Sequence, residues 1–77
     1  MKVEVLFFGV LSEITGKKTL TFNDIADTKE LNDKLIGEYP EMKSVTYRIA
    51  VNQKITNANT KLNDGDEIAF MPPFAGG

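Results

Sequence analysis

Apolar and polar residues alternate along several short stretches of this chain, and this pattern predicts β-strands. The opening stretch KVEVLFF has two faces, formed by Val3, Val5 and Phe7 and by Glu4, Leu6 and Phe8. Four further stretches have the alternation or the β-branched and aromatic content of strands: residues 18–22, 45–51, 54–56 and 67–71. Between the last two, Asp64-Gly65 predicts a turn.

One stretch has the apolar spacing of a helix, with Leu31, Leu35, Ile36 and Tyr39 on one face. Asp27 is placed to cap the first turn, and Glu30 to complete a capping box. Pro40 ends the segment, because the residue before a proline is disfavoured in a helix. We expect a helix over residues 28–38, and a helical turn or a wide loop over residues 9–16.

The order strand, strand, helix, strand, strand, strand fits an α+β fold of the ubiquitin-like β-grasp type. We expect one mixed sheet of four to five strands with a single main helix packed on one face. The first and last strands then lie side by side and parallel in the centre. One set of apolar residues is predicted to form the core under the helix: Val3, Val5, Phe7, Ile49, Val51, Ile68 and Phe70. A chain of 77 residues predicts one domain, over residues 1–71, followed by a projecting tail over residues 72–77.

Composition narrows the chemistry that the chain offers. With 42% hydrophobic and 26% charged residues it is typical of soluble globular proteins. It has no cysteine and no histidine, so intrinsic catalysis by thiolate or imidazole is excluded. The net charge of −2, with scattered lysines, argues against nucleic acid as a partner. Residues 5–11 are too short an apolar run to span a bilayer, so we expect a cytoplasmic protein without a membrane partner.

The chain ends in the unusual sequence MPPFAGG. Pro72 and Pro73 cannot donate to a sheet and fix φ near −65°, so they end the last strand and direct the tail outward. Residues 74–77 reach about 13 Å when extended, at roughly 3.3 Å per residue. The two glycines lack a Cβ, so a narrow channel can close around them. We predict that the tail enters a partner, through Pro72, Pro73, Phe74, Ala75 and Gly76, and presents the carboxylate of Gly77.

A second candidate surface lies on the sheet. Glu4 and Glu67 mark the face toward solvent, because an unpaired carboxylate is costly to bury. Alternation places a group of apolar residues on the same face: Leu6, Phe8, Ala69 and Met71, with Ala50 from the middle strand. Such a patch predicts a partner interface. The alternative is that the segment 9–16 covers Leu6 and Phe8. The acids Asp64, Asp66 and Glu67 flank a turn, and we expect no metal site there.

Along its whole length, from KVEVLFFGVLSEITG to LNDGDEIAFMPPFAGG, the chain resembles the small, sulfur-carrying subunits of molybdopterin synthase. The resemblance implies that the Gly77 carboxylate is adenylated by a ubiquitin-activating-type adenylyltransferase that uses ATP. A sulfur donor then converts it to a thiocarboxylate, which supplies sulfur for the molybdopterin dithiolene in molybdenum cofactor biosynthesis. The large synthase subunit is the implied partner, in a heterotetramer. The isolated chain is then not an enzyme and holds no permanent cofactor.

Two related functions also use an activated Gly77. The thiazole-pathway sulfur carrier is similar in fold and ends in Gly-Gly, but its relatives generally lack the Pro-Pro spacer. A carrier for another sulfurated metabolite belongs to the same class. A ubiquitin-like modifier conjugated to lysines is the other alternative. A purely structural binding module is a further hypothesis, and it predicts that deletion of Gly76 and Gly77 changes nothing.

Overall fold

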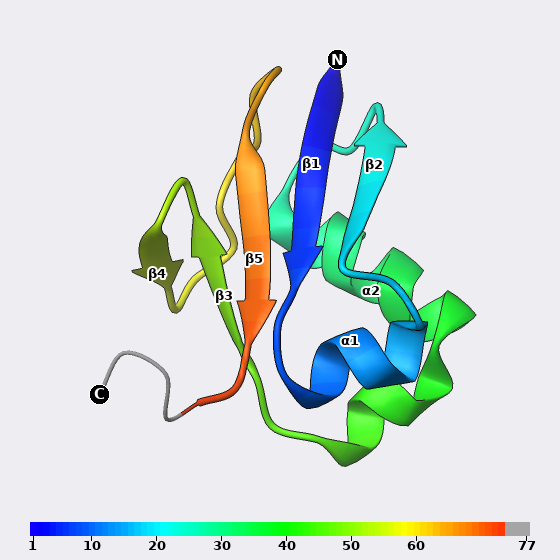
Figure 1. Ribbon diagram of the computed structural model, residues 1–77. Coiled ribbons are helices and arrows are strands. Elements are labelled where there is room, and N and C mark those ends of the chain that lie inside the picture. Colours follow the sequence, from blue (N-terminus) through cyan, green and yellow to red (C-terminus); the bar gives the residue numbers. More distant parts are fainter. Residues whose placement is uncertain (74–77) are drawn as a thin grey trace.

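The computed structural model describes residues 1–73, which fold into one sheet with helices packed against it (Figure 1). The elements are β1 (Lys2–Phe7), α1 (Val10–Thr15), β2 (Thr19–Asn23), α2 (Thr28–Glu38), a 3₁₀-helix (Pro40–Ser44), β3 (Arg48–Val51), β4 (Lys54–Thr56) and β5 (Glu67–Met71). The predicted order of strands and main helix is confirmed, and the segment 9–16 contains the short helix α1.

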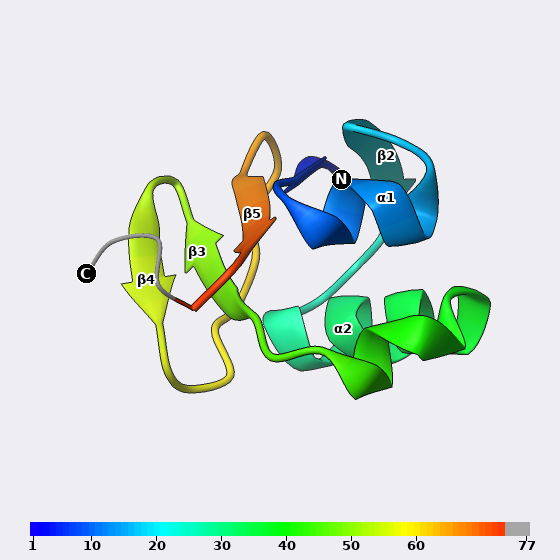
Figure 2. The same ribbon diagram turned by 60° about the horizontal axis from the view of Figure 1, so that its bottom comes forward.

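The sheet has the strand order β2-β1-β5-β3-β4. The central pair, β1 and β5, is parallel, and its register runs from Glu4 opposite Glu67 to Phe7 opposite Phe70. The other neighbouring strands are antiparallel. Figure 2 shows α2 lying across one face of the sheet. This is the β-grasp topology predicted from the sequence. No helix within residues 1–73 is long and apolar enough to cross a bilayer.

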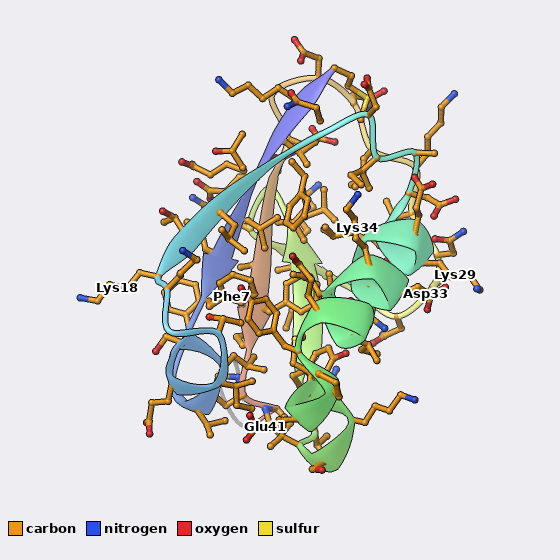
Figure 3. All side chains as sticks on the ribbon, turned by 90° about the vertical axis from the view of Figure 1, so that its right-hand side faces the viewer. Phe7, Lys18, Lys29, Asp33, Lys34 and Glu41 are labelled. Carbon is orange, nitrogen blue, oxygen red and sulfur yellow. The ribbon has the colours of Figure 1, made fainter. Side chains whose placement is uncertain are left out.

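The core lies between the sheet and α2. Five of the seven residues predicted for it are buried: Val3, Val5, Phe7, Ile68 and Phe70. Ile49 and Val51 are only partly buried against the same cluster. The ring of Phe70 lies 5.9 Å from that of Phe7 and 5.5 Å from that of Tyr47, between centroids. Figure 3 shows Phe7 between the sheet and the helices. Sequence reasoning missed buried residues outside the strands: Leu11, Ile25, Met42 and Leu62.

The helix α2 has the predicted bounds, and its first turn has the predicted cap. The Asp27 carboxylate accepts a hydrogen bond from the Glu30 N–H at 2.8 Å. The Glu30 carboxylate reaches back one residue further than a capping box requires and accepts from the Ala26 N–H at 2.6 Å. At the other end Tyr39 leaves the helical region at φ −127°, directly before Pro40. The 3₁₀-helix that follows buries Met42.

The strand predicted over residues 45–51 is shorter, because β3 begins at Arg48. Arg48 lies opposite Met71, the last residue of β5. Pro72 has no N–H to continue the ladder, so the residues before Arg48 lack a partner strand on that side. Tyr47 is held by its side chain instead: its ring packs on Phe70 and its hydroxyl donates to Asn32 Oδ1.

Candidate functional site

The base of the tail is anchored to the domain. Met71 ends β5, and Pro72 follows, half-buried. A Cβ on Gly9 would lie 2.9 Å from Pro72 Cγ, and Gly9 has φ +58°, so the loop between β1 and α1 needs glycine for this approach. Pro73 is exposed. The remaining tail residues lie outside the described part of the chain, so the roles of Phe74, Ala75, Gly76 and Gly77 stay predictions.

The sheet face opposite α2 has the composition predicted by alternation. Leu6 lies opposite Ala69, and Glu4 opposite Glu67, in the parallel β1–β5 pair. Leu6 and Met71 are half-buried, while Ala69 is 9% and Ala50 1% exposed. The two alanines face each other across β3 and β5, and longer side chains on the same face flank them: Leu6, Arg48, Ile55, Glu67 and Met71. The centre of the predicted patch is therefore recessed, and its larger side chains carry the accessible surface.

Phe8 is the most prominent apolar side chain of this region, at 48% exposed. Its N–H donates to the Phe70 carbonyl at 3.0 Å, which extends the β1–β5 ladder by one bond. The helix α1 turns Leu11 and Thr15 inward and leaves Phe8 open. The alternative that the segment 9–16 covers Phe8 is wrong. Leu6 and Phe8 instead line an open groove of about 370 Å³ with residues of α1 and β2.

Ile55 belongs to this surface and was missed in the sequence. Asn52 and Gln53 have φ of +49° and +71° and form a two-residue turn, which places Val51 opposite Lys54 and Ala50 opposite Ile55. Ile55 therefore lies on the face of Ala50 and is 41% exposed. The sequence contained a signal for this assignment, namely the turn at Asn52 and Gln53. A two-residue turn fixes the strand register and therefore the face on which each residue of β4 lies.

The acidic residues near the start of β5 accept hydrogen bonds from other residues of the chain. Asp64 accepts a hydrogen bond from the Lys2 N–H at 2.7 Å. Asp66 accepts from the Asn63 N–H at 2.7 Å and from Asn52 Nδ2 at 2.9 Å. Gly65 between them has φ +85°. Within residues 1–73 no group of three or more acidic residues is arranged to hold a metal ion.

Among residues 1–73, three groups have shifted pKa values, and each shift has a local cause. The N–H of Glu30 and the side chain of Asn59 lower the pKa of Asp27. The Asp33 carboxylate, 3.0 Å from Lys29 Nζ, raises the pKa of that amine, and Figure 3 shows the pair on α2. Burial raises the pKa of Tyr47. These groups lie on or beside α2, whereas Phe8 and its neighbours offer contact surface.

Comparison with known proteins adds the following similarities. The model of the ThiS family matches residues 5–77. The molybdopterin synthase sulfur carrier subunit of Mycobacterium tuberculosis is 39% identical over 82 residues, which cover 100% of this chain and 99% of that protein.

Two solved structures share the fold. The first comes from the protein–protein complex of subunits 1 and 2 of molybdopterin-converting factor from Helicobacter pylori, and it is 35% identical with a TM-score of 0.74 and full coverage of both chains. The second is small archaeal modifier protein 1 of Methanosarcina acetivorans, which is 25% identical with a TM-score of 0.81 and coverage of 99% and 96%.

Proposed function

The chain belongs to the ThiS family, among the sulfur carrier subunits of molybdopterin synthase, and from this premise we propose that the Gly77 carboxylate is the group that carries sulfur. The observation that carries the proposal is the similarity to a sulfur carrier subunit over the whole of both chains. The anchored Pro72 supports it, because it gives the tail a fixed exit from the domain.

The proposed cycle begins with activation, because a carboxylate does not itself accept a sulfur nucleophile. An adenylyltransferase transfers AMP from ATP to the Gly77 carboxylate and releases pyrophosphate. The outer sulfur of a donor persulfide attacks the mixed anhydride and displaces AMP, which gives an acyl disulfide between Gly77 and the donor. A thiol then attacks the donor's sulfur and breaks the S–S bond, so that a disulfide forms on the donor side and the thiocarboxylate is released on Gly77. The chain has no cysteine, so its terminus is the place where it can hold sulfur.

We further propose that the large synthase subunit binds the chain that carries the thiocarboxylate and uses its sulfur for the molybdopterin dithiolene. The similar Helicobacter pylori protein was solved in a complex of subunits 1 and 2, which supports a partner of this kind. The docking surface is the sheet face with Leu6, Phe8, Ala69 and Met71, to which Ile55 adds exposed area. Each dithiolene contains two sulfur atoms, so two carriers with a thiocarboxylate are needed for each. This requirement is consistent with the heterotetramer that we propose.

The test is the intact mass of the chain after incubation with the activating enzyme, ATP and a sulfur donor. Replacement of one oxygen by sulfur adds roughly 16 Da. Deletion of Gly77 should abolish this gain and molybdopterin formation, while the melting temperature stays nearly unchanged, because the core lies within residues 3–70. A reaction without ATP is the control. A truncated chain that still supports synthesis would rule out the carrier role.

A second candidate is protein modification, favoured by the likeness to an archaeal modifier protein. It uses the same adenylated Gly77 but transfers the terminus to a lysine amine instead of accepting sulfur. Supplying the activated chain with cell extract separates the two functions. Modification predicts ATP-dependent adducts in which residues 62–77 remain on the lysine after tryptic digestion, because Lys61 is the last basic residue of the chain. A dedicated sulfur carrier predicts the thiocarboxylate without such adducts.

A further inference from the structure

A groove of about 460 Å³ lies beside the start of β3 and is separate from the groove beside Phe8. Its lining includes Asn32 of α2, Tyr47 directly before β3, Arg48 at the start of β3, Asn57 after β4, and Pro73. Pro73 directly precedes the four terminal residues. The terminal segment therefore starts at the rim of this groove.

The groove also contains a backbone edge suited to an extended peptide. In antiparallel pairing, successive residues direct their N–H and C=O groups to alternate neighbours. The Asn52 N–H donates to Glu67 of β5 at 2.8 Å, so Ile49 faces β4, and Tyr47 faces the same side. But β4 ends at Thr56, opposite Ile49. Within residues 1–73 no backbone hydrogen bond is formed by Tyr47, so its edge is available for pairing.

The charge at the groove is complementary to a carboxylate. Arg48 is exposed, and its Nη1 makes one long hydrogen bond, 3.5 Å, to Asn57 Oδ1. The ion pairs among residues 1–73 join the Met1 amino group to Asp24 and Lys29 to Asp33. The Arg48 guanidinium thus has no carboxylate partner in that part of the chain, and its planar fork suits a carboxylate.

We propose that this groove binds the chain's own terminal segment, residues 74–77, with its backbone beside Tyr47 and the Gly77 carboxylate facing Arg48. The four residues span about 13 Å when extended, which lets the segment follow a groove that begins at Pro73. The inference rests on the proposed function, because it says where the sulfur-carrying terminus binds while no partner holds it. A partner that takes up the tail must first displace it, so the bound and released states are in competition.

The test compares amide resonances of the full chain and of a chain ending at Pro73, by ¹⁵N NMR at low salt. We expect shifts at Thr46, Tyr47, Arg48 and Asn57, and slower hydrogen exchange at the Tyr47 amide in the full chain. The full-length variant Arg48→Gln should move these signals toward those of the shorter chain. Lys54→Gln, which removes an exposed cation outside the groove, should leave them in place.

Two results would overturn the proposal. Shifts confined to the amide of Met71, with the amides of Thr46, Tyr47, Arg48 and Asn57 unchanged, would show that the groove is empty. Shifts that disappear on dilution would show that a second copy supplies the segment. Neither result bears on the proposed sulfur chemistry, which is tested separately by the mass gain at Gly77. Conversely, a docked segment without that mass gain would contradict the carrier role and leave the groove assignment standing.

Discussion

Changing Phe8 to aspartate separates binding from folding. The side chain is 48% exposed in the free domain, so about half of its surface is left for a partner to cover. Full burial of a phenylalanine contributes about 1.5–3 kcal/mol, and half of that is about 0.7–1.5 kcal/mol. An unpaired carboxylate placed in the interface costs about 1–3 kcal/mol more. We expect Phe8→Asp to weaken binding to the large synthase subunit by roughly 2–4 kcal/mol, which is about 30- to 1,000-fold in Kd.

The adjacent residue provides a matched control. Phe7 is 3% exposed, and its ring lies against Phe70. Removal of a buried phenylalanine ring costs about 3–5 kcal/mol, and an unpaired buried carboxylate adds to this loss. Phe7→Asp should therefore leave much of the domain unfolded. Phe8→Asp should lose only about 0.7–1.5 kcal/mol of stability, because only half of its side chain is buried in the free domain.

Thermal denaturation of each variant and calorimetric titration with the large subunit measure the two effects. For a domain of this size, 1 kcal/mol corresponds to about 4–8 °C in Tm. If Phe8→Asp unfolds the domain as Phe7→Asp does, the assignment of the two faces is inverted. If Phe8→Asp folds and binds with unchanged Kd, the docking surface lies elsewhere on the domain.

Three other expectations concern backbone and charge. Gly9→Ala should lower the free energy of unfolding by about 1–3 kcal/mol, because Gly9 has a positive φ and lies close to Pro72. Gly37→Ala in α2 is the control: its added Cβ meets no atom within 4 Å, so the change should be neutral or stabilising. Urea denaturation measures both variants. Changing Pro72 and Pro73 to glycine should weaken complex formation in the same titration without unfolding the domain, since a flexible spacer must be ordered on binding; unchanged affinity would show that stiffness is irrelevant. Because the folded pKa of Asp27 is lowered, the contribution of its carboxylate to stability is full above its ordinary pKa of about 3.9 and is lost as pH falls through the lower folded value. Asp27→Asn should remove this acid-side part of the pH dependence of Tm, and an identical pH profile would contradict it.

Local signals explain where the sequence predicted the fold correctly. The bounds of α2 follow from Asp27 at one end and Pro40 at the other, and both act on the nearest turn of backbone. The bounds of β5 follow in the same way from the Asp64-Gly65 turn and from Pro72. Alternation was sufficient to predict that Phe7 is buried and Phe8 exposed, because side chains in a strand have a strict period of two.

The failures depend on contacts between distant segments. Residues 45–47 have strand composition but lack a partner, because β5 ends opposite Arg48. Met42 is buried through a 3₁₀-helix that has too few residues to show a period. The low exposure of Ala50 depends on neighbours from two other strands, which alternation within one strand does not reveal. The site shares this limit, since Ile55 is assigned to its face only through the hairpin register.

In the docking mode that we propose, the close approach of Gly9 to Pro72 gives the carrier two contact sites, the sheet face and the tail, at a fixed separation. Phe8 precedes Gly9, and Met71 precedes Pro72, so the sheet contacts and the tail exit are held in one rigid frame. Once a partner binds the sheet face, entry of the tail becomes an intramolecular step. For short flexible linkers the effective concentration in such a step is of millimolar order. Each contact alone can then be weak, and a carrier that has given up its sulfur can leave quickly once the tail withdraws.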